Sequence, residues 1–206
     1  NERDENYLAN NPQIDCTRTR NNYNVIKRQC SYTQHINNRI AELDLSTKVR
    51  KDAVMMCSFV VGSDREFFRS LSEREQEKFF ADCTRFFADR YGEENIISAV
   101  VHMDETTPHL HLNLIPIADG RLCAKQLFDR KALQTLQTDF HSVVGNKWNL
   151  QRGKEGSTAK HLDTISYKVK KMKDEAVAAV LQASEAKKRK EAAEQSQAHV
   201  EQAMLE

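Results

Sequence analysis

The sequence lacks the features that mark several large classes of protein. No apolar run in its 206 residues reaches the roughly 18 to 20 residues that a membrane-spanning helix needs. Only 6 glycines and 3 prolines are present, which excludes collagen-like and mucin-like chains. The first residues, Asn1 to Asn6, are too polar for a secretory signal. We therefore expect a cytoplasmic protein with no membrane segment.

Neither the cysteine content nor the net charge indicates a disulfide framework, a zinc site or a particular binding partner. The chain has 5 cysteines, an odd number, and no two of them form a CxxC pair. A disulfide framework and a thiolate zinc site are therefore both disfavoured, and we expect reduced thiols. The net charge of +1 does not identify a partner, because a balanced total can conceal a basic surface.

The composition divides the chain into two parts. Its length suits one domain with an appendage, and a folded unit of this size buries a core without disulfides. From residue 167 to the end the sequence is rich in Ala, Lys, Glu and Gln and has neither Gly nor Pro, which favours one continuous helix. We predict a folded domain over 1–166 and a helical arm over 167–206. The arm carries a thin apolar stripe, which is compatible with a homodimer formed through this helix.

In the first part of the chain, segments with the apolar spacing of strands alternate with segments that have the apolar spacing of helices. The predicted strands are 23–26, 53–61, 96–101 and 110–115, and the predicted helices are 31–45, 64–91 and 129–148. The third and fourth strands are separated by a short polar turn and form a hairpin. The phenylalanines of 64–91 fall at helical spacing, which predicts a helix or helix pair packed on a sheet. The fold class is therefore α+β, an antiparallel sheet with helices packed on one face, followed by an extended C-terminal helix.

Three histidines carry the chemistry that the sequence predicts. His109 and His111 alternate with Leu110, so on a strand their side chains share one face. His102 ends the partner strand, where the turn brings it close to the other two. Three neutral imidazoles with open coordination positions suit Zn²⁺, Mn²⁺, Fe²⁺ or Ni²⁺ better than Ca²⁺. Glu105 could complete the coordination, orient a histidine or take a proton, whereas Asp104 suits the turn or the support of a ligand.

The segment from His102 to His111 reads H-x-D-E-x-T-P-H-x-H, and this motif resembles the metal-binding motif of the MobV (Mob/Pre) plasmid mobilisation relaxases, a branch of the HUH endonucleases. Shorter matches follow in the family's order over roughly residues 1 to 170. They include Asn1-Glu-Arg3, Arg50 to Val54, Phe128-Asp-Arg130 and Arg152-Gly153. The histidine motif is highly specific for this family. The short matches are individually weak and support the resemblance only through their order along the chain.

The resemblance implies a metal-dependent enzyme that nicks one strand of DNA at the origin of transfer of a plasmid or mobile element, for conjugative mobilisation or plasmid recombination. His102, His109 and His111 would hold the metal, most often Mn²⁺ or Mg²⁺, with Glu105 as an active-site carboxylate. A protein nucleophile would form a covalent 5′-phosphoryl link with the DNA. The family's nucleophile is expected to be a histidine directly before its Asn-Glu-Arg motif, and here that position precedes Asn1. Tyr7, Tyr23 and Tyr32 are less favoured substitutes.

The DNA partner would be origin-of-transfer DNA, single-stranded or in a hairpin near the nick. Its contacts require Lys and Arg, which neutralise phosphates and read guanine. Candidates are the basic residues in or beside the matched motifs and outside the predicted apolar faces. They are Arg3, Arg18, Arg20, Arg50, Lys51, Lys125, Arg130, Arg152 and Lys160.

Three other readings stay open at this point. A rolling-circle replication initiator would share the paired histidines, although the order of the shorter motifs argues against it. A three-histidine metal hydrolase for small phosphoesters would need a compact apolar pocket and no Arg-rich N-terminal region. A non-catalytic DNA-binding fragment would explain a sequence that does not include the expected nucleophile.

Overall fold

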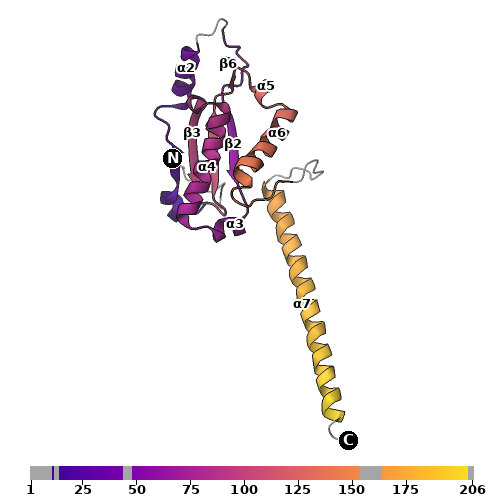
Figure 1. The fold of residues 1–206 in the computed structure, drawn as a ribbon. Coiled ribbons are helices and arrows are strands. Elements are labelled where there is room, and N and C mark those ends of the chain that lie inside the picture. The colour runs from indigo at the N-terminus through magenta and orange to yellow at the C-terminus, as the bar shows by residue number, and fades with distance from the viewer. Residues whose placement is uncertain (1–10, 12–13, 44–47, 154–163, 204–206) are drawn as a thin grey trace. The chain divides into compact units, whose positions relative to one another are not determined.

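The computed structural model describes residues 11, 14–43, 48–153 and 164–203, and Figure 1 shows its fold. It consists of two compact units, residues 1–153 and 154–206. The strands are β1 (Tyr23–Ile26), β2 (Cys57–Gly62), β3 (Ile96–His102), β4 (His109–Leu114), β5 (Ile117–Ala118) and β6 (Arg121–Leu122). The helices are η1 (Cys16–Asn21), α2 (Tyr32–Glu42), α3 (Arg65–Ser70), α4 (Glu73–Tyr91), η2 (Glu93–Asn95), α5 (Ala124–Leu127), α6 (Arg130–Phe140), η3 (His141–Gly145) and α7 (Thr164–Ala203).

The first unit is built on a four-stranded sheet in the order β1-β3-β4-β2, with every neighbouring pair antiparallel. The central strands β3 and β4 form the predicted hairpin, and His102 faces His109 across it. β5 and β6 form a separate small hairpin whose turn contains Asp119 and Gly120, both with positive φ. The predicted α+β class and antiparallel sheet are therefore confirmed.

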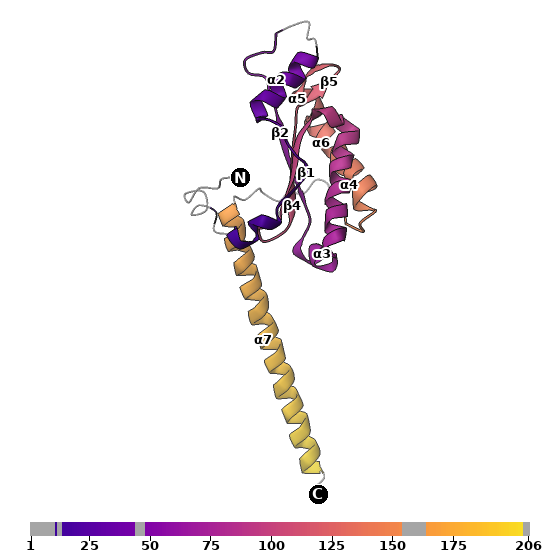
Figure 2. The same ribbon diagram turned by 90° about the vertical axis from the view of Figure 1, so that its left-hand side faces the viewer.

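One face of the sheet is covered by an aromatic layer. Phe79, Phe80 and Cys83 of α4 are fully buried, and so are Leu110 and Leu112 of β4 beneath them. Figure 2 shows α4 and α6 together on this side of the sheet. α4 begins with a capping box between Ser72 and Glu75 and ends at Tyr91, followed by the capping residue Gly92, whose φ of 89° suits glycine. The phenylalanine spacing thus correctly predicted a helix pair, α3 and α4, packed on the sheet.

The opposite face is largely open, with α2 lying over one end of it (Figure 2). Ile36 of α2 packs against Ile97 and Ile115 in a small second cluster. The hydroxyl of Tyr32 lies 3.4 Å from Ser98 Oγ, which fixes the first turn of α2 against β3. One helix therefore departs from the prediction that helices pack on one face, because a bulge between Ile96 and Ser98 turns an apolar residue of β3 to the other side.

Three local differences separate the observed elements from those predicted. β2 begins at Cys57 rather than at residue 53, because Met55 and Met56 pack on the second cluster before the strand pairing begins. η1 was not predicted, since Cys16–Asn21 is polar and lacks an apolar period. α6 ends at Phe140 and continues as a π-helical turn over His141–Gly145.

The second unit contains α7, a helix of 40 residues. It begins at Thr164, three positions before the predicted start, and its end at Ala203 is followed by residues outside those described. Val169, Met172, Val177, Val180 and Leu181 are exposed. The extended C-terminal helix is confirmed, whereas the domain boundary between residues 166 and 167 stays a prediction.

Two expectations from the composition can be compared with the fold. All five cysteines are free thiols, as expected from their number and spacing. Among the described residues, no helix combines the length and the apolarity that crossing a bilayer requires.

Candidate metal centre

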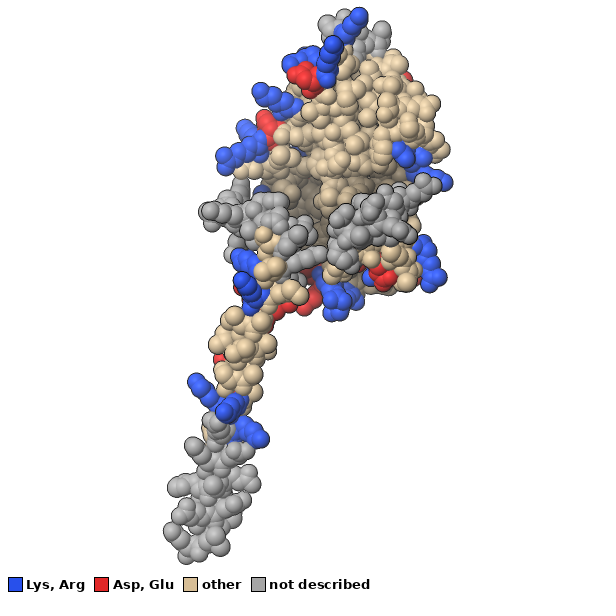
Figure 3. Space-filling view, turned by 180° about the vertical axis from the view of Figure 1, so that it is seen from behind, with Lys and Arg blue, Asp and Glu red and all other residues tan. Residues whose placement is uncertain are grey.

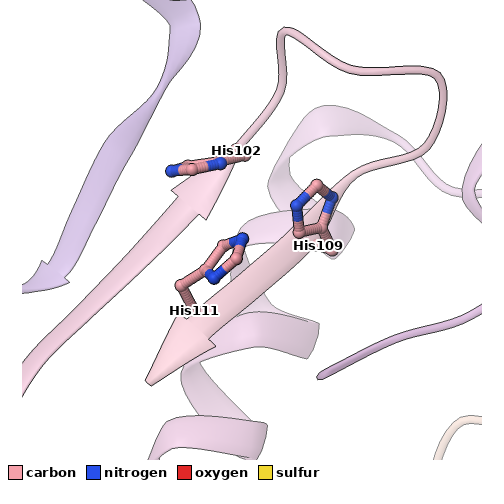
Figure 4. A group of neighbouring side chains, drawn as sticks. All are labelled: His102, His109 and His111. Atoms are coloured by element: carbon pink, nitrogen blue, oxygen red, sulfur yellow. The ribbon is translucent and has the colours of Figure 1, made fainter. Parts of the chain in front are cut away.

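The three predicted histidines meet on the open face of the sheet. The ring centroids of His102 and His111 are 4.5 Å apart, and His109 lies 4.9 Å from His111 and 5.4 Å from His102. Figure 4 shows the three imidazoles at neighbouring positions of two paired strands. Each offers a ring nitrogen, and these nitrogens all lie within 4.8 Å of one another. All three side chains are partly exposed, so the cluster is reachable from solvent.

The strand alternation explains this placement. Leu110, Leu112 and Leu114 of β4 point into the core and are fully buried, which directs His109 and His111 to the other face. The register then places His102 directly opposite His109. The apolar face therefore fixes the position of the histidines.

The tautomer of His109 is fixed by its backbone neighbour. Its Nδ1 lies 2.9 Å from the carbonyl oxygen of Thr107, and a carbonyl can only accept, so Nδ1 carries the proton. The Nε2 of His109 is then left with its lone pair for a cation. Such a carbonyl contact is the usual support for a metal-binding histidine.

Glu105 lies at the margin of the histidine cluster. Its Oε1 is 3.7 Å from His102 Nδ1 and 3.9 Å from His109 Nε2, and its side chain is half-buried. Both distances exceed a hydrogen bond but suit a carboxylate that shares a cation or receives a proton. The loop after β3 thus brings the predicted carboxylate to the predicted histidines.

The neighbouring Asp104 has a different position. Its side chain is fully buried, and its Oδ2 accepts a hydrogen bond of 2.8 Å from Thr19 Oγ1. Its backbone oxygen accepts from Asp15 N at 2.7 Å, and Met103 N donates to Asn22 Oδ1 at 2.7 Å. These three hydrogen bonds attach η1 to the histidine loop. Sequence analysis missed Thr19 and Asn22 because their role depends on a contact with residues more than 80 positions away.

The predicted basic residues fall into separate groups. Arg18 and Arg20 lie on η1, beside the histidine loop, and are exposed. Arg152 lines a hollow of about 620 Å³ together with Gly62, which is paired with His109, so it also lies at the histidine end. Figure 3 looks onto the open side of the sheet and shows Lys and Arg side chains along the margins of the domain.

The other basic residues follow the opposite end of the strands. Lys125 and Arg130 follow β6, beyond the end of β4 that lies away from His109. Arg50 forms an exposed ion pair of 2.6 Å with Asp52 and, like Lys51, precedes the end of β2 that pairs with Leu114. Arg3 and Lys160 lie outside the described residues. All nine basic residues stay predictions as DNA contacts.

The tyrosines differ in their access to the cluster. Tyr23 packs against the aromatic core, and burial raises the pKa of its hydroxyl well above the ordinary value. A buried phenol with a raised pKa is a poor nucleophile, so Tyr23 does not suit that role. Tyr32 contacts Ser98 rather than the histidines, and Tyr7 lies outside the described residues.

The donor set fits a divalent transition metal. Three imidazoles converge from a rigid hairpin, one has its proton fixed on the far nitrogen, and a carboxylate lies beside them. A partly exposed cluster of this kind leaves coordination positions open to a ligand from solution. Mg²⁺ prefers oxygen ligands, so the set favours Mn²⁺, Zn²⁺ or Ni²⁺ over Mg²⁺.

Comparison with solved structures finds the same fold bound to DNA and metal. The chain resembles the MobM relaxase domain (MOBV; Mob_Pre) bound to plasmid pMV158 oriT DNA in a Mn-bound crystal structure. The match has 36% sequence identity and a TM-score of 0.72, over 77% of this chain and 83% of that chain. A complex of the same domain with 26-nucleotide pMV158 oriT DNA matches with a TM-score of 0.67 and 33% identity, over 75% of this chain and 95% of that one.

Curated relatives agree with the structural comparison. A plasmid recombination enzyme from Bacillus sp is 39% identical over 168 residues, which is 80% of this chain and 40% of the relative. One from Lactiplantibacillus plantarum is 40% identical over 162 residues, which is 77% of this chain and 45% of the relative. The chain therefore spans less than half the length of these relatives. The Mob_Pre family model, described as plasmid recombination enzyme, matches residues 1–169, and the chain belongs to this family.

Proposed function

We propose that this chain is the relaxase domain of a plasmid mobilisation or recombination enzyme, which binds origin-of-transfer DNA and nicks one strand in the presence of Mn²⁺. The observation that carries the proposal is the cluster of His102, His109 and His111 on the open sheet face. The MobM domain with the same fold was crystallised with both oriT DNA and Mn. The order of motifs and the family match favour this function over a rolling-circle initiator or a small-molecule hydrolase.

The residues of this chain have distinct parts in the reaction. His102, His109 and His111 would hold the cation, which draws charge from a non-bridging oxygen of the scissile phosphate when bound. The nucleophile would be the histidine that the family is expected to carry directly before its Asn-Glu-Arg motif, and it would attack phosphorus through a ring nitrogen. A P–N bond then replaces the P–O3′ bond, and the 3′ oxygen leaves and takes up a proton. The protein retains the 5′-phosphoryl end of the DNA.

We propose that Asp104 is a positioning residue. Through Thr19 and the backbone of Asp15, it attaches η1 to the loop that carries Glu105. This keeps Arg18 and Arg20 beside the histidines, where a phosphate backbone bound at the site can reach them.

The nicking activity can be tested with the full-length protein and a supercoiled plasmid that carries its origin of transfer. We expect Mn²⁺-dependent conversion to open circles, with protein bound covalently to the 5′ end, and complete inhibition by EDTA. A matched plasmid without the origin should stay supercoiled. If the protein binds Mn²⁺ and origin DNA but never cleaves it, the chain is a non-catalytic DNA-binding module and the proposal fails.

The role of Glu105 can be separated from that of the histidines by Glu105→Gln. We propose that this carboxylate takes a proton and that the three imidazoles hold the metal without it, because its Oε1 lies at the margin of the cluster, 3.7 Å from His102 Nδ1 and 3.9 Å from His109 Nε2. Affinity for Mn²⁺ should then change less than threefold, whereas the cleavage rate should fall about 100-fold or more. A parallel loss of Mn²⁺ affinity would assign Glu105 to the metal instead.

Two further properties belong to this proposal. The exposed apolar side chains of α7, such as Met172 and Val180, support a homodimer through this helix. Sedimentation equilibrium of the chain and of Met172→Lys tests it, and a wild-type monomer would contradict it. A cytoplasmic location is supported by the free thiols.

A further inference from the structure

A hollow of about 370 Å³ lies on the open face of the sheet, one strand away from the histidines. Val100 lines this hollow and is also paired with His111, while Asn24 of β1 is paired with Val100 on the other side. Neighbouring strands lie about 4.8 Å apart, so Asn24 is roughly 10 Å from His111 across the sheet. A DNA strand bound at the metal centre would therefore pass over the hollow with an adjacent nucleotide.

The wall of the hollow offers a stacking platform. The guanidinium carbon of Arg28 lies 4.1 Å from the centre of the Tyr32 ring, and both residues line the hollow. Tyr32 is 38% exposed. An aromatic ring and an arginine plane in contact form the surface on which unpaired bases stack in single-stranded nucleic acid complexes.

The ring of Tyr32 is held in place from below. Its hydroxyl lies 3.4 Å from Ser98 Oγ, and Asn113 Nδ2 donates to both of these oxygens. Ser58 Oγ in turn donates to Asn113 Oδ1 at 2.6 Å. This polar row runs across β2, β4 and β3, so the platform is anchored to the same strands that carry the histidines.

The remaining lining residues provide donors, acceptors and positive charge. Asn22 uses its Oδ1 to accept from Met103 N, which leaves its Nδ2 as the donor on that side chain. Asn24 is exposed and offers both a donor and an acceptor, the pair with which asparagine reads an adenine edge. Lys27 and Arg28 lie beside them, and none of the residues lining the hollow is acidic. The chemistry suits a nucleotide with its base inward and its phosphate outward.

We propose that this hollow binds one unpaired nucleobase of the DNA strand next to the scissile phosphate, with Tyr32 and Arg28 as its stacking platform and Asn24 as the residue that selects the base. The proposal rests on the proposed relaxase function, since it gives the site its substrate. The bound base would fix the register of the strand over the metal centre. Specificity for the nick position would thus come from a residue on β1, outside the histidine motif.

The test is an abasic scan of a bound strand, repeated with a Tyr32 variant. The probe is a labelled 22-nucleotide single strand that the wild-type chain selects from a random pool, in which each base is removed in turn. Removal of one particular base should lower wild-type affinity roughly 5- to 100-fold, the range for loss of a stacked base. Tyr32→Leu should lower affinity for the intact probe by a similar factor and show no further loss at that position.

Three matched variants separate stacking from folding, from charge and from base selection. Tyr32→Phe keeps the ring and should retain the wild-type pattern in the scan. Lys27→Ala should weaken every probe alike and reduce the salt dependence of binding. Asn24→Ala should bind the intact probe but lose the preference among the four bases at the same position.

The possible failures are distinguishable. If the pool yields no single strand that the wild-type chain binds, the proposed function itself fails. If a strand is bound but Tyr32→Leu retains the full penalty at every abasic position, binding does not use the hollow and the inference is overturned. Unchanged Mn²⁺ affinity in Tyr32→Leu confirms that the variant is folded around its metal centre.

Discussion

The two faces of the four-stranded sheet come from alternate residues of the same strands, and they differ in almost every property. On β4, Leu110 and Leu112 are fully buried under the aromatic layer, whereas His109 and His111 face outward and stay partly exposed. One face is closed by packing, and the other keeps its polar groups available to a ligand. The comparison teaches that stability and chemistry are separated by a single residue step along the strand.

The buried face should show the largest effect on stability. Phe80 is fully buried and stacks on Phe68 with ring centroids 5.5 Å apart. Phe80→Ala should lower the free energy of unfolding by about 3–5 kcal/mol, because it removes a large side chain and leaves a cavity. Urea unfolding in EDTA measures this change.

The matched control for Phe80 lies on the open face. Val60 is 67% exposed and is paired with His111, so Val60→Ala should change the free energy of unfolding by less than about 0.5 kcal/mol. Equal losses for the two variants would contradict the division between the faces.

The open face should show its effect in metal binding instead. His111→Ala should weaken Mn²⁺ binding by more than about 100-fold, because loss of a ligand exceeds the 10- to 100-fold cost of losing a supporting residue. Unfolding in EDTA should change by less than about 1 kcal/mol. Isothermal titration with Mn²⁺ measures the affinity, and His35→Ala, on α2, is the control. Unaltered Mn²⁺ binding in His111→Ala would show that the histidine cluster does not bind the metal.

The contact between η1 and the histidine loop lies between these extremes. Thr19→Val removes the hydroxyl donor of the fully buried Asp104 carboxylate and should cost about 1–2 kcal/mol. Amide exchange of residues 16–21 should accelerate, while Mn²⁺ affinity changes less than in His111→Ala. Thr17→Val is the control, because the Thr17 hydroxyl donates to its exposed neighbour Asp15 and, within the described part of the chain, does not reach Asp104. Identical behaviour of the two threonine variants would show that Asp104 does not position η1.

The smallest effect is expected at the start of α4, which supports the buried face. Ser72→Ala breaks the capping box with Glu75 and should cost about 0.5–2 kcal/mol. The hydrogen bonds from the Ser72 side chain and backbone hold the pKa of Glu75 below its ordinary value.

The depressed pKa of Glu75 gives this effect a pH dependence. The stabilisation is complete above the unfolded-state pKa of the carboxyl and is lost as the pH falls through its lower folded-state pKa. The difference between wild type and Ser72→Ala should therefore shrink in acid, as urea unfolding at neutral and acidic pH would show. A difference that grows in acid would contradict the capping role of Glu75.

The histidine site could be predicted from sequence because it depends on local geometry. Alternation on β4 and the short turn after β3 place His102, His109 and His111 together without knowledge of the rest of the chain. The aromatic helix pair could also be predicted from local sequence, because its apolar spacing and the glycine that ends it, Gly92, lie within one continuous segment. Short-range periodicity therefore determined both faces at the centre of the sheet.

The missed features depend on contacts that are distant in the sequence. η1 has no apolar period and is held by hydrogen bonds to Met103 and Asp104. The start of β2 depends on Met55 and Met56, which pack beneath α2 instead of pairing. The hollow beside Tyr32 joins β1, α2 and β3, so no single motif could indicate it.

The central claim is that the imidazoles of the open face bind the metal, and pulsed electron paramagnetic resonance of Mn²⁺ bound to the chain tests it most directly. The account predicts one Mn²⁺ per chain with ¹⁴N couplings from imidazole, and it predicts that these couplings disappear in the triple variant His102→Ala, His109→Ala, His111→Ala. Mn²⁺ bound to the wild-type chain without nitrogen couplings, or couplings that persist in the triple variant, would contradict it.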